Sequence, residues 1–219
     1  MLCHAHSRME KIMLIWLIII AGVVFLDQLT KWLTVINLDL RESITVIDGF
    51  FSFTYVQNKG AAFSMLSNHR WVFMTISTVA IVALSIYLWK KRKDSKLLGV
   101  ALSFIIGGGI GNMVDRTILG YVIDFLDFII GRDANGHPIH FAIFNIADTF
   151  VCVGVGLFAL YIILDEFKQY KKEKAAKVEI NINNNISVIG NENETNLDIN
   201  VENSSVNAND NAENDNTAD

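Results

Sequence analysis

The sequence predicts an all-helical membrane protein with four transmembrane helices and a small antiparallel β-sheet on the outer (periplasmic) face. Hydrophobic residues make up 52% of the 219 residues, and the chain has a single proline. The apolar residues are gathered in four blocks, and a helix needs roughly 20 apolar residues to cross the bilayer core. Between the first two blocks, short segments alternate apolar and polar residues, which is the period of a half-buried strand.

The four apolar blocks set the expected domain organisation. They are residues 12–26, 71–89, 97–114 and 143–164. The first block is long enough to span a bilayer only if its helix continues through Asp27 and Lys31 to Ile36. We expect a cytoplasmic N-terminus over residues 1–11, a four-helix membrane domain over residues 12–167 with outer loops at 37–70 and 115–142, and a cytoplasmic segment over residues 168–219.

The basic residues predict the orientation of the helices, because lysine and arginine are enriched in loops that stay in the cytoplasm. Ten of them lie between the second and third blocks or after the fourth: Lys90, Lys91, Arg92, Lys93, Lys96, Lys168, Lys171, Lys172, Lys174 and Lys177. Both termini are therefore expected inside and both long loops outside. From Val178 onward the chain has nine acidic residues, no basic ones and many asparagines, a composition that predicts a disordered tail.

The first outer loop is predicted to form a hairpin. Residues 44–46 and 51–55 have the alternation of strands, and Asp48-Gly49 supplies a turn signal between them. In the second outer loop, Asn135-Gly136 is a strong signal for a two-residue hairpin. The polar residues around it, Asp127, Asp133, His137 and His140, are expected to be solvated surface groups.

Four carboxylates are predicted to meet near the outer end of the helices. With a rise of 1.5 Å per residue, Asp27, Asp115 and Asp148 lie about 22 to 27 Å from the inner ends of their blocks. Asp124 follows in the outer loop and can reach the same level. Because charged groups inside membrane segments are costly and usually functional, this convergence predicts a site at the boundary of lipid and water.

Two neighbouring carboxylates favour acid–base hydrolysis. They cannot both ionise easily, so one activates a water molecule while the protonated one polarises a scissile carbonyl. This is the chemistry of aspartic proteases, and it requires no metal or cofactor. The chain has no His-Glu-x-x-His zinc motif and no Gly-x-Ser-x-Gly nucleophile elbow.

A small proton- or ion-coupled transporter is the main alternative, and a non-catalytic membrane scaffold is a weaker one. A transporter site lies near the bilayer midplane, whereas these carboxylates are predicted near the outer interface. The sequence also has no visible inverted repeat. A hydrolytic site is therefore favoured.

Five segments resemble the motifs of lipoprotein signal peptidases (signal peptidase II), and they occur in the family's order. They are residues 27–31 (DQLTK), 58–64 (NKGAAFS), 107–116 (GGGIGNMVDR), 120–125 (GYVIDF) and 144–148 (FNIAD). Residues 129–138 make the connection between the last two motifs longer than is usual in the family. A glycine-rich stretch within the third motif, residues 107–111, is expected to permit close helix packing.

The resemblance implies a fold, an activity and a set of site residues. The expected fold has four transmembrane helices and a small outer sheet, in the bacterial inner membrane. The expected activity is cleavage of prolipoproteins just before a cysteine that carries diacylglycerol, with membrane lipids around the site, globomycin as inhibitor and no nucleic acid as partner.

By the resemblance, Asp124 and Asp148 are the catalytic pair. The resemblance also implies that further residues line the site and orient substrate: Asn58, Gly60, Asn112, Arg116 and Asn145. Asp27 and Lys31, four residues apart on one helix, are expected to pair and support the site. Asp115 could be a third acid of the site, but it neighbours Arg116, and we expect it to pair with that residue and support the site.

Overall fold

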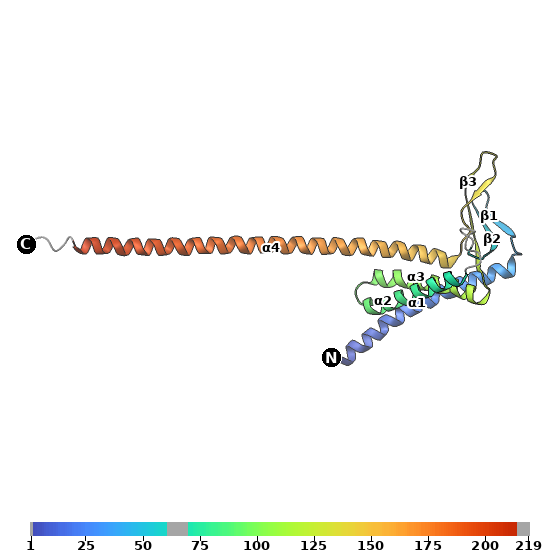
Figure 1. Cartoon of the computed structure of the whole chain (residues 1–219), viewed down its shortest axis with the longest axis horizontal. Helices are drawn as coiled ribbons and strands as arrows, with labels where there is room; N and C mark the ends of the chain where they lie inside the picture. The colour runs from blue at the N-terminus through green and yellow to red at the C-terminus, as the bar shows by residue number, and fades with distance from the viewer. Residues whose placement is uncertain (1, 61–69, 214–219) are drawn as a thin grey trace, which may run out of the picture. The chain divides into compact units, whose positions relative to one another are not determined.

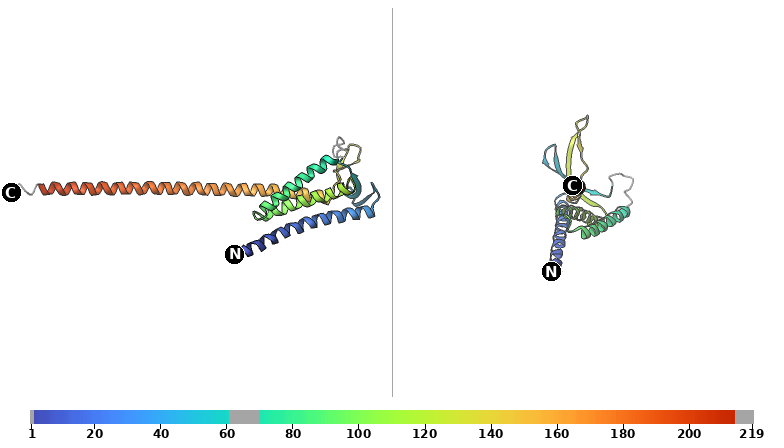
Figure 2. Two further views of the ribbon diagram at one scale, coloured as in Figure 1. Left: turned by 60° about the horizontal axis from the view of Figure 1, so that its bottom comes forward. Right: turned by 90° about the vertical axis from the view of Figure 1, so that its left-hand side faces the viewer.

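The computed structural model describes residues 2–60 and 70–213. The elements in chain order are α1 (Leu2–Asn37), β1 (Ser43–Ile47), β2 (Phe51–Asn58), α2 (Arg70–Lys91), α3 (Lys96–Ile118), β3 (Val122–Arg132), β4 (Pro138–His140) and α4 (Ile146–Glu213). Helices α1, α2 and α3 lie side by side, and the strands gather at one end of them (Figures 1 and 2). Helix α3 packs against both α1 and α2.

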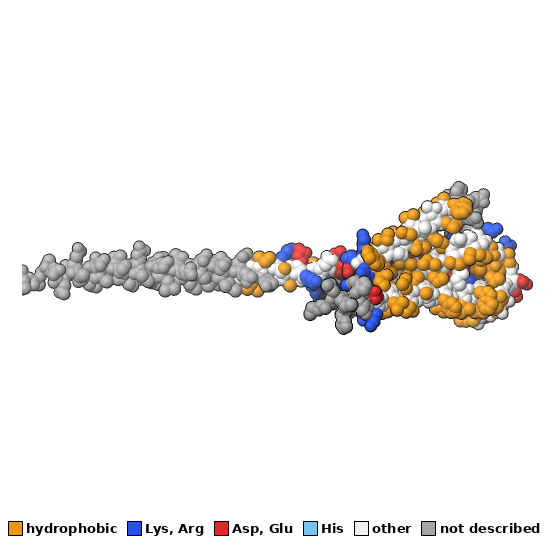
Figure 3. All heavy atoms as spheres, turned by 90° about the horizontal axis from the view of Figure 1, so that it is seen from below, with side chains coloured by type: hydrophobic (Ala, Val, Ile, Leu, Met, Phe, Trp, Pro, Cys, Tyr) orange, Lys and Arg blue, Asp and Glu red, His pale blue; other side chains and the backbone are white. Residues whose placement is uncertain are grey.

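Within the described residues, four helices are long and apolar enough to cross a membrane. The candidate spans are Glu10–Asn37, Met74–Lys91, Lys96–Ile118 and Ile146–Ile182. Hydrophobic side chains, orange in Figure 3, cover much of the visible surface of the bundle. The prediction of four such helices is confirmed, and α1 continues through Asp27 and Lys31 to Asn37 as its length requires.

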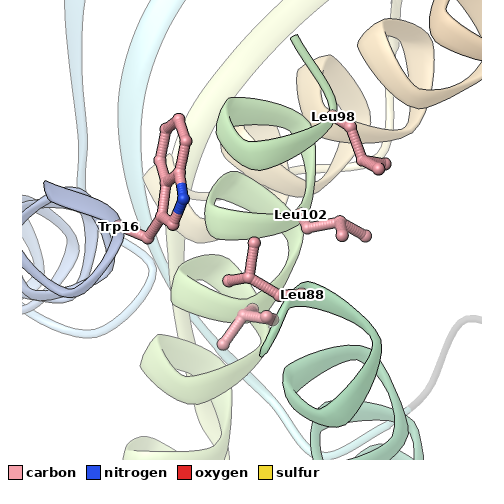
Figure 4. Packing of buried hydrophobic residues seen from close by; sticks show 5 residues of the cluster. Trp16, Leu88, Leu98 and Leu102 are labelled. Carbon is pink, nitrogen blue, oxygen red and sulfur yellow. The ribbon is translucent and has the colours of Figure 1, made fainter. Parts of the chain in front are cut away.

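The core of the bundle lies where α1, α2 and α3 meet. Trp16 of α1 and Leu88 of α2 pack with Leu98, Leu102 and Ile106 of α3, all of them buried (Figure 4). The cluster fixes α3 as the central helix. Because α3 carries residues 107–116 and ends next to β3, this packing also positions the polar residues at its far end.

Small residues on α3 let the neighbouring helices come close. A Cβ atom at Gly108 would collide with the backbone oxygen of Ala147 in α4, and one at Gly111 would lie 2.5 Å from Asp27 Oδ2 of α1. The predicted role of residues 107–111 in close packing is confirmed at these positions. The carboxylate of Asp27 therefore reaches the interface of three helices.

The four strands form one antiparallel sheet in the order β1-β2-β3-β4. The predicted hairpin between β1 and β2 is confirmed, with Gly49 at a φ of 68° in its turn. The hairpin predicted at Asn135-Gly136 is confirmed between β3 and β4, but residues 133–137 connect its strands, so the predicted two-residue loop is wrong. Gly136 has a φ of 84° there. The long strand β3 was not predicted. Residues 122–125 are all buried, so the two-residue alternation that marks a half-exposed strand is missing there.

Helix α4 extends further than the composition predicts. It continues to Glu213, through residues 178–213, for which the acidic, asparagine-rich sequence predicts disorder. A helix satisfies its own backbone hydrogen bonds, so it can continue beyond the apolar segment without a partner layer. Residues 163–219 are a unit separate from residues 1–162.

Candidate active site

The first turn of α4 holds Asp148 in a capping arrangement. Asn145 immediately precedes the helix, and its Oδ1 accepts the Asp148 backbone N–H at 2.9 Å. In return, Asp148 Oδ2 accepts the Asn145 backbone N–H at 3.3 Å. This is a reciprocal capping box, here with asparagine and aspartate as its two members. The half-buried Asp148 carboxylate therefore lies at the positive end of the α4 dipole, which favours a negative charge.

Asp124 faces the same region from β3 and is almost fully buried, at 2% exposure. Its Oδ2 accepts a hydrogen bond from Asn58 Nδ2 at 2.8 Å, and its Oδ1 accepts one from Asn145 Nδ2 at 2.7 Å. Burial raises the pKa of Asp124 to about 6; the charge of Asp148 adds to this shift, and the Asn58 hydrogen bond opposes it. Asp124 therefore binds a proton more readily than an ordinary aspartate.

Two asparagine side chains connect the two carboxylates. Asn112 of α3 donates from Nδ2 to Asp148 Oδ1 at 2.8 Å. Asn145 donates from Nδ2 to Asn112 Oδ1 at 3.0 Å as well as to Asp124. Three segments far apart in the sequence thus meet in one hydrogen-bonded network: the end of α3, strand β3 and the start of α4.

A buried ion cluster lies beside this network. Lys31 Nζ, on α1, contacts Asp27 Oδ2 at 2.8 Å, Asp115 Oδ2 at 2.9 Å and Asn112 Oδ1 at 2.9 Å. Asp27 Oδ1 also accepts the backbone N–H of Ala147 in α4 at 2.9 Å. The cluster therefore ties α1 to α3 and α4, and the predicted pairing of Asp27 with Lys31 is confirmed.

Asp115 pairs with Lys31 rather than with Arg116. Neighbouring helix residues point in different directions and do not face each other. Arg116 Nη1 instead donates to the backbone oxygen of Asn112 at 3.4 Å. Asp115 also accepts the Ile123 backbone N–H at 3.1 Å and Gln28 Nε2 at 2.9 Å, so it holds the start of β3 against α3.

Gln28 was missed as a site residue by sequence reasoning. Its side chain joins Asp115 to the backbone oxygen of Gly111. The sequence did contain one indication of this role, because Gln28 is a polar residue next to Asp27 within an apolar segment. Gly60, expected in the site, donates its backbone N–H to Asn58 Oδ1 at 2.9 Å with a φ of 92°. Residues 61–64 of the same motif lie outside the described residues.

The prediction that Asp127 is a solvated loop charge is wrong. Asp127 lies on β3 with 3% exposure, accepts a hydrogen bond from Thr54 Oγ1 at 2.7 Å and contacts His140 Nδ1 at 2.7 Å. The strand that carries it was not recognised, so its burial was not foreseen. Asp133 is exposed, as expected; hydrogen bonds led by the His137 backbone N–H lower the pKa of its carboxyl group.

Four apolar helices with a cluster of buried carboxylates at the sheet end of the bundle define a multi-pass membrane protein with a polar site among its described residues. The family model described as signal peptidase (SPase) II matches residues 19–164. The chain belongs to the signal peptidase II family, and it is a peptidase that removes signal peptides from prolipoproteins.

Curated relatives and solved structures agree with this family. The lipoprotein signal peptidase of Bacillus pumilus (strain SAFR-032) is 46% identical over 143 residues, covering 65% of this chain and 88% of the relative. That of Halalkalibacterium halodurans is 39% identical over 163 residues, covering 74% of this chain and all of the relative (100%). A bacterial membrane enzyme solved by the in meso method at 2.3 Å resolution is 33% identical, with a TM-score of 0.61 over 69% of this chain and 88% of that one. A second such structure, at 1.9 Å resolution, is 34% identical with a TM-score of 0.58, over 67% of this chain and 91% of that one.

Proposed function

We propose that the chain is a membrane aspartyl endopeptidase in which Asp124 and Asp148 are the catalytic pair. It cleaves prolipoproteins just before the cysteine that carries diacylglycerol. The observation that supports this most is the link between the two carboxylates through Asn112 and Asn145, because it gathers two acids from distant segments into one network. Two carboxylates that no such network held near each other would not share a proton or a water molecule.

The two acids have different environments, which suggests their roles. Asp148 is half-buried at the positive end of α4 and accepts hydrogen bonds from Asn112 Nδ2 and the Asn145 backbone, an arrangement that suits a general base. Asp124 is buried and its pKa is raised to about 6. In this proposal Asp148 is the general base, and Asp124 carries the shared proton.

The reaction then follows from these protonation states. Asp148 takes a proton from water while the water oxygen attacks the scissile carbonyl carbon, and Asp124 donates its proton to the carbonyl oxygen. In the second step Asp148 passes its proton to the amide nitrogen, the carbon–nitrogen bond breaks, and Asp124 recovers a proton from the collapsing gem-diol. Both acids return to their starting states.

The location of the site suits a lipid-anchored substrate. The basic link between α2 and α3, with Lys90, Lys91, Arg92, Lys93 and Lys96, lies at the opposite end of α3 from the sheet. The positive-inside rule then puts the sheet and the carboxylates on the periplasmic face of the inner membrane and both termini in the cytoplasm. A scissile bond next to an acylated cysteine lies at this interface without extraction of the acyl chains.

The remaining assignments complete the proposal. Asn58, Gly60, Asn112, Arg116 and Asn145 orient the substrate peptide, and globomycin competes for the same site. Residues 12–167 carry the activity. The cytoplasmic segment of residues 168–219 contributes no catalytic group.

Cleavage of a purified diacylated prolipoprotein, with and without globomycin, tests the proposal. Asp124→Asn and Asp148→Asn should each reduce kcat by about 10²-fold or more, because acid–base groups typically contribute that much. Asp133→Asn, in the exposed hairpin turn, is the matched control and should cleave normally. Turnover near the wild-type rate in either active-site variant would contradict that residue's assignment. Ion flux through liposomes without any cleavage would instead favour a transporter.

A further inference from the structure

We propose that Lys31 is a positioning residue for the catalytic pair: its ammonium group fixes the orientation of the Asn112 side chain, which then presents an N–H group to Asp148. This inference rests on the proposed function of Asp124 and Asp148. It goes beyond the support that an ion pair gives to the fold, because it gives Lys31 an effect on the reaction itself.

The ammonium group of Lys31 is fully used. It has three hydrogens and no acceptor, and the structure gives it three acceptors: Asp27 Oδ2 at 2.8 Å, Asp115 Oδ2 at 2.9 Å and Asn112 Oδ1 at 2.9 Å. The side chain is 2% exposed, so water does not compete for these hydrogens. Two of these contacts are with carboxylates, and the third is with the Asn112 amide in the proposed active site.

The contact with Lys31 decides which way Asn112 points. The oxygen and nitrogen of an asparagine amide have similar shapes, and their hydrogen-bond partners distinguish them. An ammonium group can only donate, so the atom that faces Lys31 is Oδ1. The same oxygen accepts from Asn145 Nδ2 at 3.0 Å, and the Asn112 Nδ2 group is therefore left to donate to Asp148 at 2.8 Å.

Asn145 is oriented by a separate donor, the backbone N–H of Asp148, which bonds to Asn145 Oδ1 at 2.9 Å. Its Nδ2 group then donates to Asp124. Of the two linking asparagines, Asn112 thus donates to Asp148 and Asn145 donates to Asp124, and of these two only Asn112 contacts Lys31. The positive charge of Lys31 also polarises the Asn112 amide and strengthens its N–H as a donor.

Asp27 provides the contrast that separates positioning from structural support. It pairs with Lys31 and also accepts the Ala147 N–H, so it holds α1 against α4. The charged groups that hydrogen bonds or ion pairs join to the Asn112–Asn145 network beside Asp148 are Asp124 on β3, Lys31 and Asp27 on α1, and Asp115 and Arg116 on α3. Among these surrounding groups on the helices, Lys31 is the one whose side chain bonds to the Asn112 side chain.

The test compares the wild-type chain with Asp27→Asn, with Lys31→Met and with the double variant that carries both changes. The double variant removes the ion pair without leaving Asp27 charged and unpaired. For each, the pH profile of kcat/KM is measured with a diacylated prolipoprotein in detergent, and a melting temperature is recorded at each pH. A purely structural role would lower the melting temperature and leave the pH profile in place.

Loss of Lys31 should move the acidic limb of the profile upward by about one pH unit, because the nearby positive charge is gone and only Asn145 still holds the Asn112 side chain in place. Below that limb, kcat/KM then falls about tenfold relative to wild type at a given pH. Asp27→Asn should lower the melting temperature without any upward movement. Lys31→Arg, which keeps the charge, should keep the wild-type limb even where kcat is reduced.

An acidic limb at the wild-type pH in a folded, active double variant would overturn the role of Lys31. If the double variant does not fold, an acidic limb at the wild-type pH in folded Lys31→Met would overturn it equally. Failure of the wild-type chain to cleave the prolipoprotein would instead count against the proposed function, so the two failures are distinct.

Discussion

Asn58 provides a sensitive test of the protonation state proposed for Asp124. Its Nδ2 group donates to Asp124 Oδ2 at 2.8 Å, and this hydrogen bond holds down a pKa that burial raises to about 6. In the proposed mechanism Asp124 must be protonated, so kcat/KM of the wild-type chain should fall as the pH rises through about 6. Asn58→Ala removes a donor to the ionised form, and Asp124 should then keep its proton to a higher pH.

The size of the effect follows from the hydrogen bond. A hydrogen bond to a charged group contributes about 1.5 to 3 kcal/mol, and one pKa unit corresponds to about 1.4 kcal/mol. Because Asn58 is only partly buried, the lower end applies, and the alkaline limb should move up by about one pH unit. Asn58→Asp places a second carboxylate against Asp124 and should move the limb further in the same direction.

The assay is the pH profile of kcat/KM with a diacylated prolipoprotein, which reports the free enzyme. The Asn58→Ala variant also loses the acceptor for the Gly60 N–H, so its maximal rate should fall; the position of the limb is the quantity to compare. Gln57→Ala is the matched control, because its side chain donates to Tyr55 Oη. An alkaline limb that stays in place or moves down in Asn58→Ala would refute the assignment of the proton to Asp124.

Three further predictions follow from burial, packing and the tail. The raised pKa of Asp124 stabilises the fold below pH 3.8, and this contribution is lost as the pH rises through about 6. The free energy of unfolding of the wild-type chain, relative to that of Asp124→Asn, should therefore fall by about 3 kcal/mol between pH 3 and pH 8. Unfolding measurements across this range test the prediction, and a difference that does not change with pH would refute it. Gly111→Ala should destabilise the fold by about 1 to 3 kcal/mol, because its Cβ atom would lie 2.5 Å from the Asp27 carboxylate. Gly156→Ala, whose Cβ atom would have nothing within 4 Å, should melt like the wild-type chain. Equal melting temperatures for the two variants would contradict this packing. A chain that ends at Lys177 should cleave prolipoprotein at the wild-type rate, and a large loss would assign a role to the tail.

The parts of the fold that depend on length and periodicity were predictable from sequence. The apolar blocks predicted the four helices. The constant rise per residue of a helix predicted that Asp27, Asp115 and Asp148 lie at a similar depth in the membrane. The structure joins them there, through Lys31 and Asn112. The hairpin of β1 and β2 was predictable for the same reason, because alternation repeats over several residues.

The parts that depend on partners were not predictable. Strand β3 has no alternation because its first four residues are all buried, and the burial of Asp127 was missed with it. The preference of Asp115 for Lys31 over its neighbour Arg116 comes from packing between α1 and α3, which no local pattern encodes. The link that Asn112 and Asn145 form between the carboxylates could likewise be recognised only from the three-dimensional positions of their hydrogen-bond donors and acceptors.

The dual use of Asn145 has a consequence for biogenesis. One side chain both begins the last apolar helix and fastens Asp124 in place. Translation supplies this residue after the other three apolar helices have emerged, so a nascent chain that has not yet inserted α4 holds Asp124 but lacks both Asn145 and Asp148. In the proposed mechanism the chain can therefore cleave peptides only after its last apolar helix has been inserted. An incompletely inserted chain would not cleave other polypeptides that leave the translocon.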